Sequence, residues 1–227
     1  MKKVFTAYEA VTHIKTGNSV MIGGFGLVGA PLSLIDELIN HHASELTIIS
    51  NNIGEPGKGL GELLRRGKIK KAIGSYFTSN REVGDLYNQG KLDVQLMPQG
   101  TFSESIRAGG SGIGGYYTRT GVGTELAKGK EERVINGDRY ILEYPLHADI
   151  AIIKAWKADE LGNLVYYKTA QNFNPLMATA ADYVIAEVDQ IVEVGELSPE
   201  EIVTQHLYVD AIVESSLILT KEGVVEK

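Results

Sequence analysis

Residues 20–31 read VMIGGFGLVGAP, and this stretch decides how the whole chain is interpreted. A short apolar run meets a loop rich in glycine, and a helical pattern of apolar residues begins at Pro31. Such a succession is typical of a buried strand, a connecting loop and an amphipathic helix. Gly24, Gly26 and Gly29 also satisfy the spacing G-x-G-x-x-G, which often marks a loop that binds a dinucleotide. The stretch therefore predicts a strand-loop-helix unit with a candidate phosphate-binding loop.

Helix and strand patterns alternate up to about residue 100. Candidate helices begin at Thr6, Pro31, Gly61 and Asn80, and candidate strands span Ser19–Ile22, Leu46–Ser50, Ile69–Tyr76 and Asp93–Met97. This order predicts a mainly parallel sheet covered by helices. Because such sheets bind ligands beyond the carboxyl ends of their strands, we expect loops 23–30, 50–57 and 98–101 to form the binding edge.

The second half of the chain has a different pattern. It predicts a hairpin that turns at Gly137-Asp138, strands at Asp149–Trp156, Tyr183–Val188 and Ile191–Val194, and a short helix that begins at Ser198. The sequence shows no internal repeat and no linker composition. The expected fold is one α/β domain over residues 1–227. It has an open, mainly parallel sheet flanked by helices and an added antiparallel section.

Charge and composition exclude several classes of protein. The net charge is −7, and the one short basic run is Arg65–Lys71. This argues against nucleic-acid binding, because phosphate contacts need clustered positive charge. There are no cysteines, and the five histidines show no metal-ligand spacing. With no apolar stretch near the roughly 20 residues of a membrane span and no signal-peptide pattern, we expect a cytoplasmic protein without a metal or a membrane.

Two features argue against a dinucleotide at the glycine loop. In the dinucleotide fold the helix begins inside the glycine motif. Pro31 has no N–H and is tolerated only in the first turn of a helix, so here the helix begins after Gly29. An acidic residue should also follow the next strand and bind the ribose. That strand ends instead in Ser50-Asn51-Asn52, so the residues argue against a nicotinamide cofactor.

Two interpretations of the loop remain. In the first, the glycines only make a tight connection between strand and helix. In the second, the backbone N–H groups near the start of the helix bind an anion or an oxyanion. Phe25 would then form an apolar wall between glycines, which suits a ligand with both apolar and phosphate parts.

The run Val20–Pro31 resembles the signature of the A, or small, chains of the family I coenzyme A transferases. That signature has three apolar residues, Gly-Gly-Phe, three residues of any kind, Gly, one residue of any kind and Pro. Thr16 stands where the family usually has Asp or Asn. Further similar segments are Pro98–Thr101, Ile106–Gly110, Tyr117-Thr118, Thr120–Thr124, Lys154–Asp159, Gly162-Asn163 and Asn172–Pro175. The likeness runs in order from about Lys3 to Val213 and is greatest to 3-oxoacid or short-chain acyl CoA-transferases.

The resemblance implies the fold of this family and transfer of CoA between a thioester and a free carboxylate. A Glu carboxylate attacks the acyl-CoA carbonyl to form a mixed anhydride, and the CoA thiolate then returns to form an enzyme thioester. The family carries this Glu in its B subunit, in a Glu-Asn-Gly motif that this chain lacks. Glu55 and Glu104 are the nearest candidates, and we expect them to be a loop acid and a helix-surface acid. We therefore expect no catalytic nucleophile in this chain and a Glu from a partner.

The resemblance also implies site residues. The coenzyme A site would be lined by Gly23, Gly24, Phe25, Gly26, Leu27, Val28 and Gly29. Gln99 matches a family Gln near the reacting carbonyl, where an amide can donate to a developing oxyanion. The alternative for Gln99 is a helix-entry residue that bonds its own turn. Asn51 and Asn52 either hold substrate or are turn residues, and the glycines of 109–123 either cover the site or contact the partner.

The implied assembly is an α2β2 complex with the B subunit of the family. Coenzyme A would be a substrate with no permanently bound cofactor, and the short-chain acids would be acetoacetate with succinate or acetate. Two alternatives stay open: a non-catalytic domain of the same fold that binds CoA or a nucleotide, and a component of an acyl-CoA hydrolase. The non-catalytic alternative is supported by the absence of the Glu-Asn-Gly motif from this chain. It is opposed by the presence together of the glycine loop, Pro98–Thr101 and Thr120–Thr124, because a decayed site need not keep all three.

Overall fold

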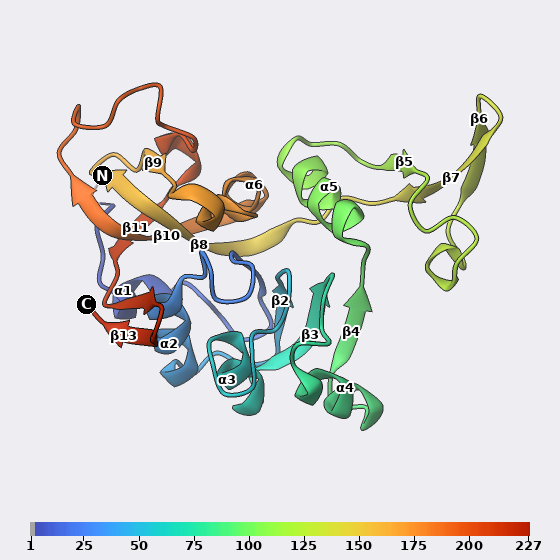
Figure 1. Ribbon diagram of the computed structural model, residues 1–227, viewed down its shortest axis with the longest axis horizontal. Helices are drawn as coiled ribbons and strands as arrows, with labels where there is room; N and C mark the ends of the chain where they lie inside the picture. Colours follow the sequence, from blue (N-terminus) through green and yellow to red (C-terminus); the bar gives the residue numbers. More distant parts are fainter. Residues whose placement is uncertain (1–2) are drawn as a thin grey trace.

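The computed structural model describes residues 3–227, and a mainly parallel sheet lies at its centre (Figure 1). In the described residues this sheet has eight strands, with the parallel order β11-β10-β8-β1-β2-β3-β4 and β9 antiparallel to β8. The strands are β1 Ser19–Ile22, β2 Leu46–Ile49, β3 Ile69–Gly74, β4 Asp93–Leu96, β8 Ala148–Asp159, β9 Leu164–Val165, β10 Ala181–Val192 and β11 Ala211–Glu214. The sheet type predicted from the sequence is confirmed.

Strand β1 lies inside the sheet, and the strand order reverses beside it. The chain adds β2, β3 and β4 on one side of β1, then returns to β8 on the other side and continues to β10 and β11. In open α/β sheets, ligands bind beyond the carboxyl ends of the strands at such a point. The glycine loop follows β1, so the topology alone makes it the candidate binding loop.

Helices cover both faces of the sheet. They are α1 Ala7–Val11, α2 Leu32–Asn40, α3 Leu60–Arg65, α4 Arg81–Asn88, α5 Gln99–Gly110 and α6 Asn174–Thr179. Helices α1 to α4 share one buried apolar cluster with the sheet, and α5 and α6 share another. A capping box of Thr6 and Glu9 opens α1 where a helix was predicted to begin, and α2 begins directly after Pro31, as predicted.

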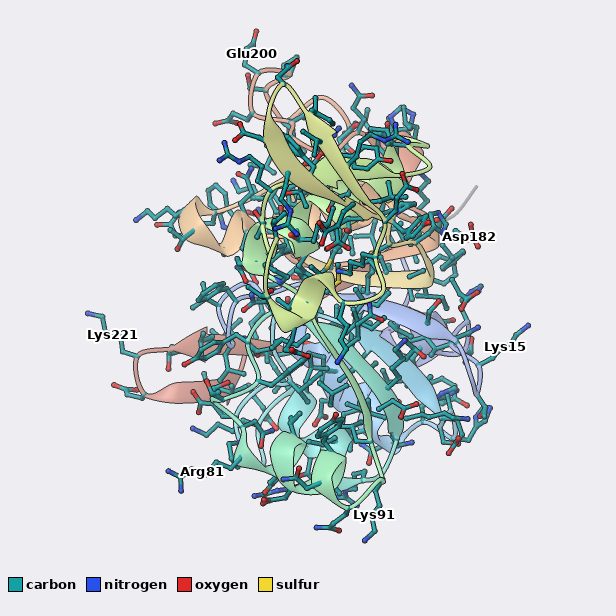
Figure 2. The ribbon with its side chains drawn as sticks, turned by 90° about the vertical axis from the view of Figure 1, so that its right-hand side faces the viewer. Lys15, Arg81, Lys91, Asp182, Glu200 and Lys221 are labelled. Carbon is teal, nitrogen blue, oxygen red and sulfur yellow. The ribbon has the colours of Figure 1, made fainter. Side chains whose placement is uncertain are left out.

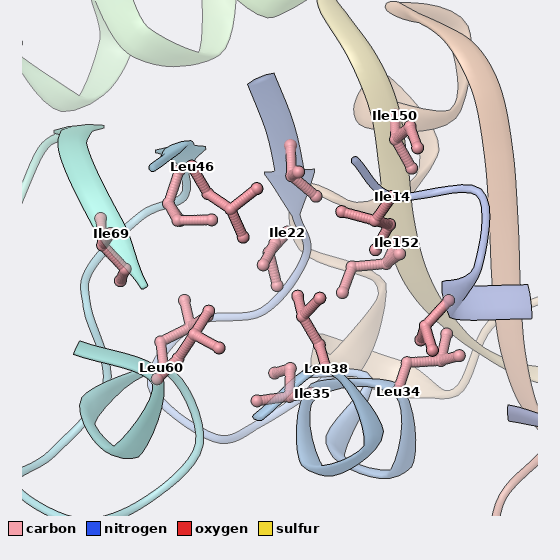
Figure 3. Close-up of a cluster of buried hydrophobic side chains, with 14 of the residues drawn as sticks. Ile14, Ile22, Leu34, Ile35, Leu38, Leu46, Leu60, Ile69, Ile150 and Ile152 are labelled. Atoms are coloured by element: carbon pink, nitrogen blue, oxygen red, sulfur yellow. The ribbon is translucent and has the colours of Figure 1, made fainter. Parts of the chain in front are cut away.

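Strands β1 and β2 are mostly apolar because both of their faces are largely buried. Successive side chains of a strand point to opposite faces, so Ile22 joins the cluster under α2 while Met21 joins the cluster under α5 and α6. Figure 3 shows Ile22 and Ile152 facing Ile35 and Leu38 of α2. All four of these side chains are at most 1% exposed. Helix α2, which follows the glycine loop, is therefore fixed against the strand that precedes the loop.

An antiparallel section projects from the body beyond α5 (Figure 1). It contains β5 Tyr116–Thr118, β6 Glu132–Ile135 and β7 Asp138–Glu143, in the order β5-β7-β6. The predicted hairpin is present, but its turn is Asn136-Gly137, one residue earlier than expected. Both turn residues have positive φ, 53° and 89°, as a two-residue hairpin turn of this kind requires.

Two further expectations are wrong. Tyr183–Val188 and Ile191–Val194 do not form two strands, because β10 pairs with β8 without interruption as far as Val192. No helix begins at Ser198. Its hydroxyl donates to Glu200, 2.7 Å away, instead of capping a backbone N–H, and the chain makes an isolated turn there.

Charged side chains lie on the outside of the molecule (Figure 2). Figure 2 shows Lys15, Arg81, Lys91 and Asp182 pointing away from the body. Between residues 3 and 227, no helix combines the length and the apolar character that crossing a membrane requires.

A buried carboxylate from β10 caps α2. Helix α2 has no side-chain cap of its own, since Pro31 stands at its N-cap. Glu187 is fully buried and accepts hydrogen bonds from the N–H groups of Ser33 and Leu34, at 2.9 and 3.1 Å. The Lys154 ammonium lies 3.3 Å from the same carboxylate. A negative charge at the start of a helix stabilises it, so Glu187 fixes the helix that follows the glycine loop.

We predict that Glu187→Gln lowers the free energy of unfolding by about 1–3 kcal/mol, because an amide turns one NH₂ group toward buried donors. Urea unfolding measures the change. Glu62→Gln is the matched control. Glu62 forms an exposed i,i+4 pair with Arg66 at 2.9 Å, so its loss should cost less than about 1 kcal/mol. Equal effects of the two substitutions would contradict the capping role of Glu187.

Candidate functional site

The carboxyl ends of β1 to β4 meet at one edge of the sheet, as predicted. The glycine loop follows β1, Asn51 lies just beyond β2, Ser75 directly follows β3, and Gln99 opens α5 after β4. Parallel pairing of each strand with the next fixes this arrangement. Sequence reasoning missed Ser75, because the apolar pattern extends the predicted strand to Tyr76 whereas β3 ends at Gly74.

The glycine loop closes on itself in a tight turn. The N–H of Phe25 donates to the carbonyl of Val28 at 2.9 Å, and the N–H of Val28 donates back at 3.3 Å. Gly26 has φ of 63°, a conformation that favours glycine. Among the described residues, the N–H groups of Gly26 and Leu27 have no acceptor. The tip of the loop therefore offers two free donors next in sequence to Phe25, which is 57% exposed.

The glycines of the loop differ in what surrounds them. A Cβ at Gly23 would lie 1.8 Å from Oδ1 of Asn174, and a Cβ at Gly29 would lie 2.3 Å from the carbonyl oxygen of Ala170. A Cβ at Gly26 would meet no atom within 4 Å. Gly23 and Gly29 are thus required by packing inside the protein, whereas Gly26 borders open space where a ligand can approach.

Two asparagines from the second half of the chain hold the loop. Oδ1 of Asn172 accepts from the N–H of Gly24 at 3.1 Å, and its Nδ2 donates to the carbonyl of Val28 at 3.0 Å. Nδ2 of Asn174 donates to the carbonyl of Gly29 at 3.0 Å. In the sequence these residues stood out only through the family resemblance, because the contact joins Gly24 and Asn172, which are 148 positions apart.

The loop after β2 repeats the backbone pairing of the glycine loop, although its turn differs, since positive φ falls on Gly57 and not on the first turn residue as at Gly26. Glu55 pairs with Lys58 as Phe25 pairs with Val28. The two loops also touch, since a Cβ at Gly59 would lie 3.2 Å from the Leu27 side chain. The two loops have little sequence in common beyond glycines at positive φ, Gly24 and Gly29 in the first loop and Gly54 and Gly59 in the second, so the similarity is not visible in the sequence.

The hollow beside the glycine loop is small. A cavity of about 190 Å³ is lined in part by Leu27, Val28, Lys154, Trp156 and Tyr167. Ligand sites usually enclose roughly 300–1,000 Å³. A larger hollow of about 600 Å³ lies at the amino ends of the strands, beside Glu45 and Asp93, away from the loops. At the edge of the sheet formed by the carboxyl ends of β1 to β4 (the carboxyl edge), the described chain therefore provides walls of a binding site and not a closed pocket.

The Gln99 side chain does not bond its own turn. Its Oε1 accepts from Nδ2 of Asn51 at 2.9 Å and from the Ser75 hydroxyl. Gln99 is exposed, and its Nε2 has no acceptor among residues 3–227. The two N–H donors of this amide are therefore available to another molecule.

Asn51 and Asn52 lie behind Gln99. They are 1% and 7% exposed, and their amide groups bond to each other and to protein neighbours. The structure brings Asn51 to Gln99 and Ser75, while Asn52 bonds to Asn51 and to the backbone of Gly54. Both asparagines are therefore inner residues that support the edge.

The two glutamates considered as nucleophiles are held elsewhere. Glu55 is paired with Lys58 at 3.4 Å, and both side chains are more than half exposed. Glu104 receives a forked hydrogen bond from the Arg107 guanidinium, which holds the pKa of this carboxyl below its usual range. Neither carboxylate bonds to Gln99 in the part of the chain that the structure describes.

Comparison of the sequence with known proteins identifies its family. A family model described as "Coenzyme A transferase" matches residues 4–215. The chain is 49% identical over 210 residues to the A subunit of 3-oxoadipate CoA-transferase from Pseudomonas putida, covering 92% of this chain and 91% of that protein. It is 48% identical over 213 residues to the A subunit of succinyl-CoA:3-ketoacid coenzyme A transferase from Helicobacter pylori strain J99, covering 93% and 92%.

Solved structures share the fold. An acyl-CoA transferase from E. coli O157:H7 superposes with a TM-score of 0.85 at 22% identity, covering 94% of this chain. The chain spans about half, 47%, of the length of that protein. Glutaconate coenzyme A-transferase from Acidaminococcus fermentans gives a TM-score of 0.80 at 20% identity, covering 94% of this chain and 75% of that one. Together with the family model and the sequence relatives, these findings show that the chain belongs to the coenzyme A transferase family.

Proposed function

We propose that this chain is the A subunit of a cytoplasmic CoA-transferase that moves CoA between an acyl-CoA and a short-chain carboxylate. The acids are of the acetoacetate, succinate and acetate type, and no permanently bound cofactor takes part. One observation carries the proposal. The carboxyl edge presents uncharged donors at the glycine loop and at Gln99, and no free carboxylate bonds to them among the described residues. Such an edge can bind and polarise a thioester but lacks the nucleophile.

The partner, a B subunit, supplies the nucleophile in this proposal. Its Glu carboxylate attacks the carbonyl carbon of the acyl-CoA, and the CoA thiolate leaves from the tetrahedral intermediate. The thiolate then attacks the glutamyl carbonyl of the anhydride, which releases the first acid and leaves CoA on the Glu as a thioester. The second acid reverses these steps. The small cavity beside the glycine loop is consistent with a site that closes only when the partner is bound.

Gln99 acts on the oxygen of the reacting carbonyl. Negative charge develops on this oxygen in each tetrahedral intermediate, and a preorganised donor there lowers the barrier. The Nε2 of Gln99 is free, lies at the carboxyl edge and adds no charge of its own. Asn51 and Asn52 are buried, so in this proposal they support Gln99 and do not touch substrate.

The glycine loop binds the CoA portion through its tip. Gly26 borders open space, the N–H groups of Gly26 and Leu27 are free donors, and Phe25 offers an apolar wall. Free N–H groups bind phosphate or carbonyl oxygen, while the ring covers apolar parts of the ligand. The remaining glycines of the loop serve its packing. An α2β2 assembly is the stoichiometry that we propose for the complex.

Reconstitution tests the proposed function. We expect CoA transfer from acetoacetyl-CoA to acetate or succinate only when this chain is purified with a B subunit that carries a Glu-Asn-Gly motif. The assay follows the loss of acetoacetyl-CoA absorbance. Transfer by this chain alone, or a stable complex without any transfer, would contradict the proposal.

Gln99→Ala should lower kcat by roughly 10–10³-fold in the intact complex, the range for loss of one oxyanion donor. The KM for the acyl-CoA should change little, because the donor acts on charge that develops only in the transition state. Gln89→Ala, at the exposed end of α4, is the control and should leave kcat unchanged. An unchanged kcat for Gln99→Ala would remove Gln99 from the site.

Gly26→Val should weaken CoA binding by obstructing the tip of the loop, as measured by calorimetry on the complex. Gly67→Val is a matched control. Gly67 has φ of 68° and no atom within 4 Å of an added Cβ, as at Gly26, but it lies in the turn before β3. Both variants carry a similar backbone strain of about 1–2 kcal/mol. If the two variants bind CoA equally well, the loop assignment fails.

A further inference from the structure

We propose that Asn52, Asn51 and Ser75 form a hydrogen-bond relay that fixes the orientation of the Gln99 amide, so that its NH₂ group faces the reacting carbonyl. Asn52, Asn51 and Ser75 are positioning residues that act through Gln99. The inference rests on the proposed oxyanion role of Gln99. It explains why an amide, whose two ends have opposite polarity, presents only its donor end to the substrate.

The relay begins at a group that has only one polarity. The backbone N–H of Gly54 donates to Oδ1 of Asn52 at 2.9 Å. A backbone N–H cannot accept a hydrogen bond, so the oxygen of Asn52 must face it. The Nδ2 of Asn52 therefore faces the opposite way, toward Asn51.

Each amide then sets the orientation of the next. Nδ2 of Asn52 donates to Oδ1 of Asn51 at 3.1 Å, and Nδ2 of Asn51 donates to Oε1 of Gln99 at 2.9 Å. Reversing Asn51 would bring its NH₂ against the NH₂ of Asn52. Reversing Gln99 would bring its NH₂ against the NH₂ of Asn51. The Gly54 N–H thus determines which way the amides of Asn52 and Asn51 face, and these two amides determine which way the Gln99 amide faces.

Ser75 holds the last step from a neighbouring strand. Its hydroxyl accepts from Nδ2 of Asn51 at 3.0 Å and donates to Oε1 of Gln99. The oxygen of Gln99 therefore receives two donors, one from the end of β2 and one from the end of β3. A hydroxyl can rotate, so Ser75 strengthens the orientation, while the asparagines determine it.

Burial makes the relay effective. Asn51 and Asn52 are almost completely shielded from water, and an unmet hydrogen bond in such surroundings is costly. Gln99 is exposed, and without the relay water would satisfy either orientation of its amide. The relay thus prepares the donor before substrate binds, which is the property that oxyanion stabilisation needs.

One substitution tests the relay because it replaces the NH₂ donor of Asn52 with an oxygen acceptor of nearly the same size. In Asn52→Asp, an oxygen replaces the Nδ2 group and faces Oδ1 of Asn51. Asn51 then turns its NH₂ toward Asp, and Gln99 turns its own NH₂ inward and its oxygen toward substrate. In the reconstituted complex we expect kcat to fall by roughly 10–10³-fold, as for Gln99→Ala, with KM for acyl-CoA changed by less than about twofold.

A double variant separates the relay from a simple effect of charge. In a Gln99→Ala background, Asn52→Asp should cause no further loss of kcat, since the group through which it acts is gone. Asn88→Asp is the control for charge, because Asn88 is exposed at the end of α4. An additive loss in the double variant, or an unchanged kcat for Asn52→Asp beside a lowered kcat for Gln99→Ala, would overturn the relay while leaving the proposed function intact. If Gln99→Ala itself has no effect, the oxyanion role fails instead.

Asn51→Asp provides a second route if Asn52→Asp does not fold, as judged by circular dichroism. Its two oxygens accept from Asn52 and draw the NH₂ of Gln99 inward. The same fall in kcat, absent in the Gln99→Ala background, is expected. Full activity of a folded Asn51→Asp complex, with Gln99→Ala impaired, would contradict the proposal.

Discussion

The parallel pairing of β1 with β2, β2 with β3 and β3 with β4 is the constraint on which the candidate site depends. This pairing brings four strand ends to one edge. Ser75 and Gln99, which are 24 and 48 positions from Asn51 in the sequence, therefore become its hydrogen-bond partners. The return of the chain to β8 on the other side of β1 places the glycine loop where the strand order reverses. The position of the site thus follows from topology before any side chain is considered.

Some glycines of the loop are required by packing, and another borders the space where a ligand can bind. Gly23 and Gly29 are needed because Asn174 and Ala170 lie too close for a side chain. Gly26 faces open space and has no such neighbour. The interpretation of the loop as a tight connection therefore explains part of the motif, and the ligand-binding interpretation is supported at its tip. Helix α2 anchors the far end of the loop, with Glu187 from β10 at its start.

Much of this architecture could be predicted from the sequence. The alternating patterns predicted the parallel sheet, and Pro31 predicted the start of α2. Because the strands were expected to be parallel, the loops that follow them were correctly predicted to meet at one edge of the sheet. Contacts between distant residues could not be predicted, because a single sequence carries no signal that Asn172 meets the glycine loop or that Ser75 meets Gln99. The helix predicted at Ser198 failed for a local reason, since its hydroxyl bonds to a side chain instead of a backbone N–H.

The central claim is that this chain binds and polarises the thioester while a partner provides the nucleophile. The most direct measurement treats the reconstituted complex with acetoacetyl-CoA, without an acceptor acid, and then with borohydride, which reduces an enzyme thioester. Peptide mass spectrometry locates the reduced residue. We expect one reduced Glu, located on the partner chain, and none on this chain. A reduced Glu55 or Glu104 would contradict the claim.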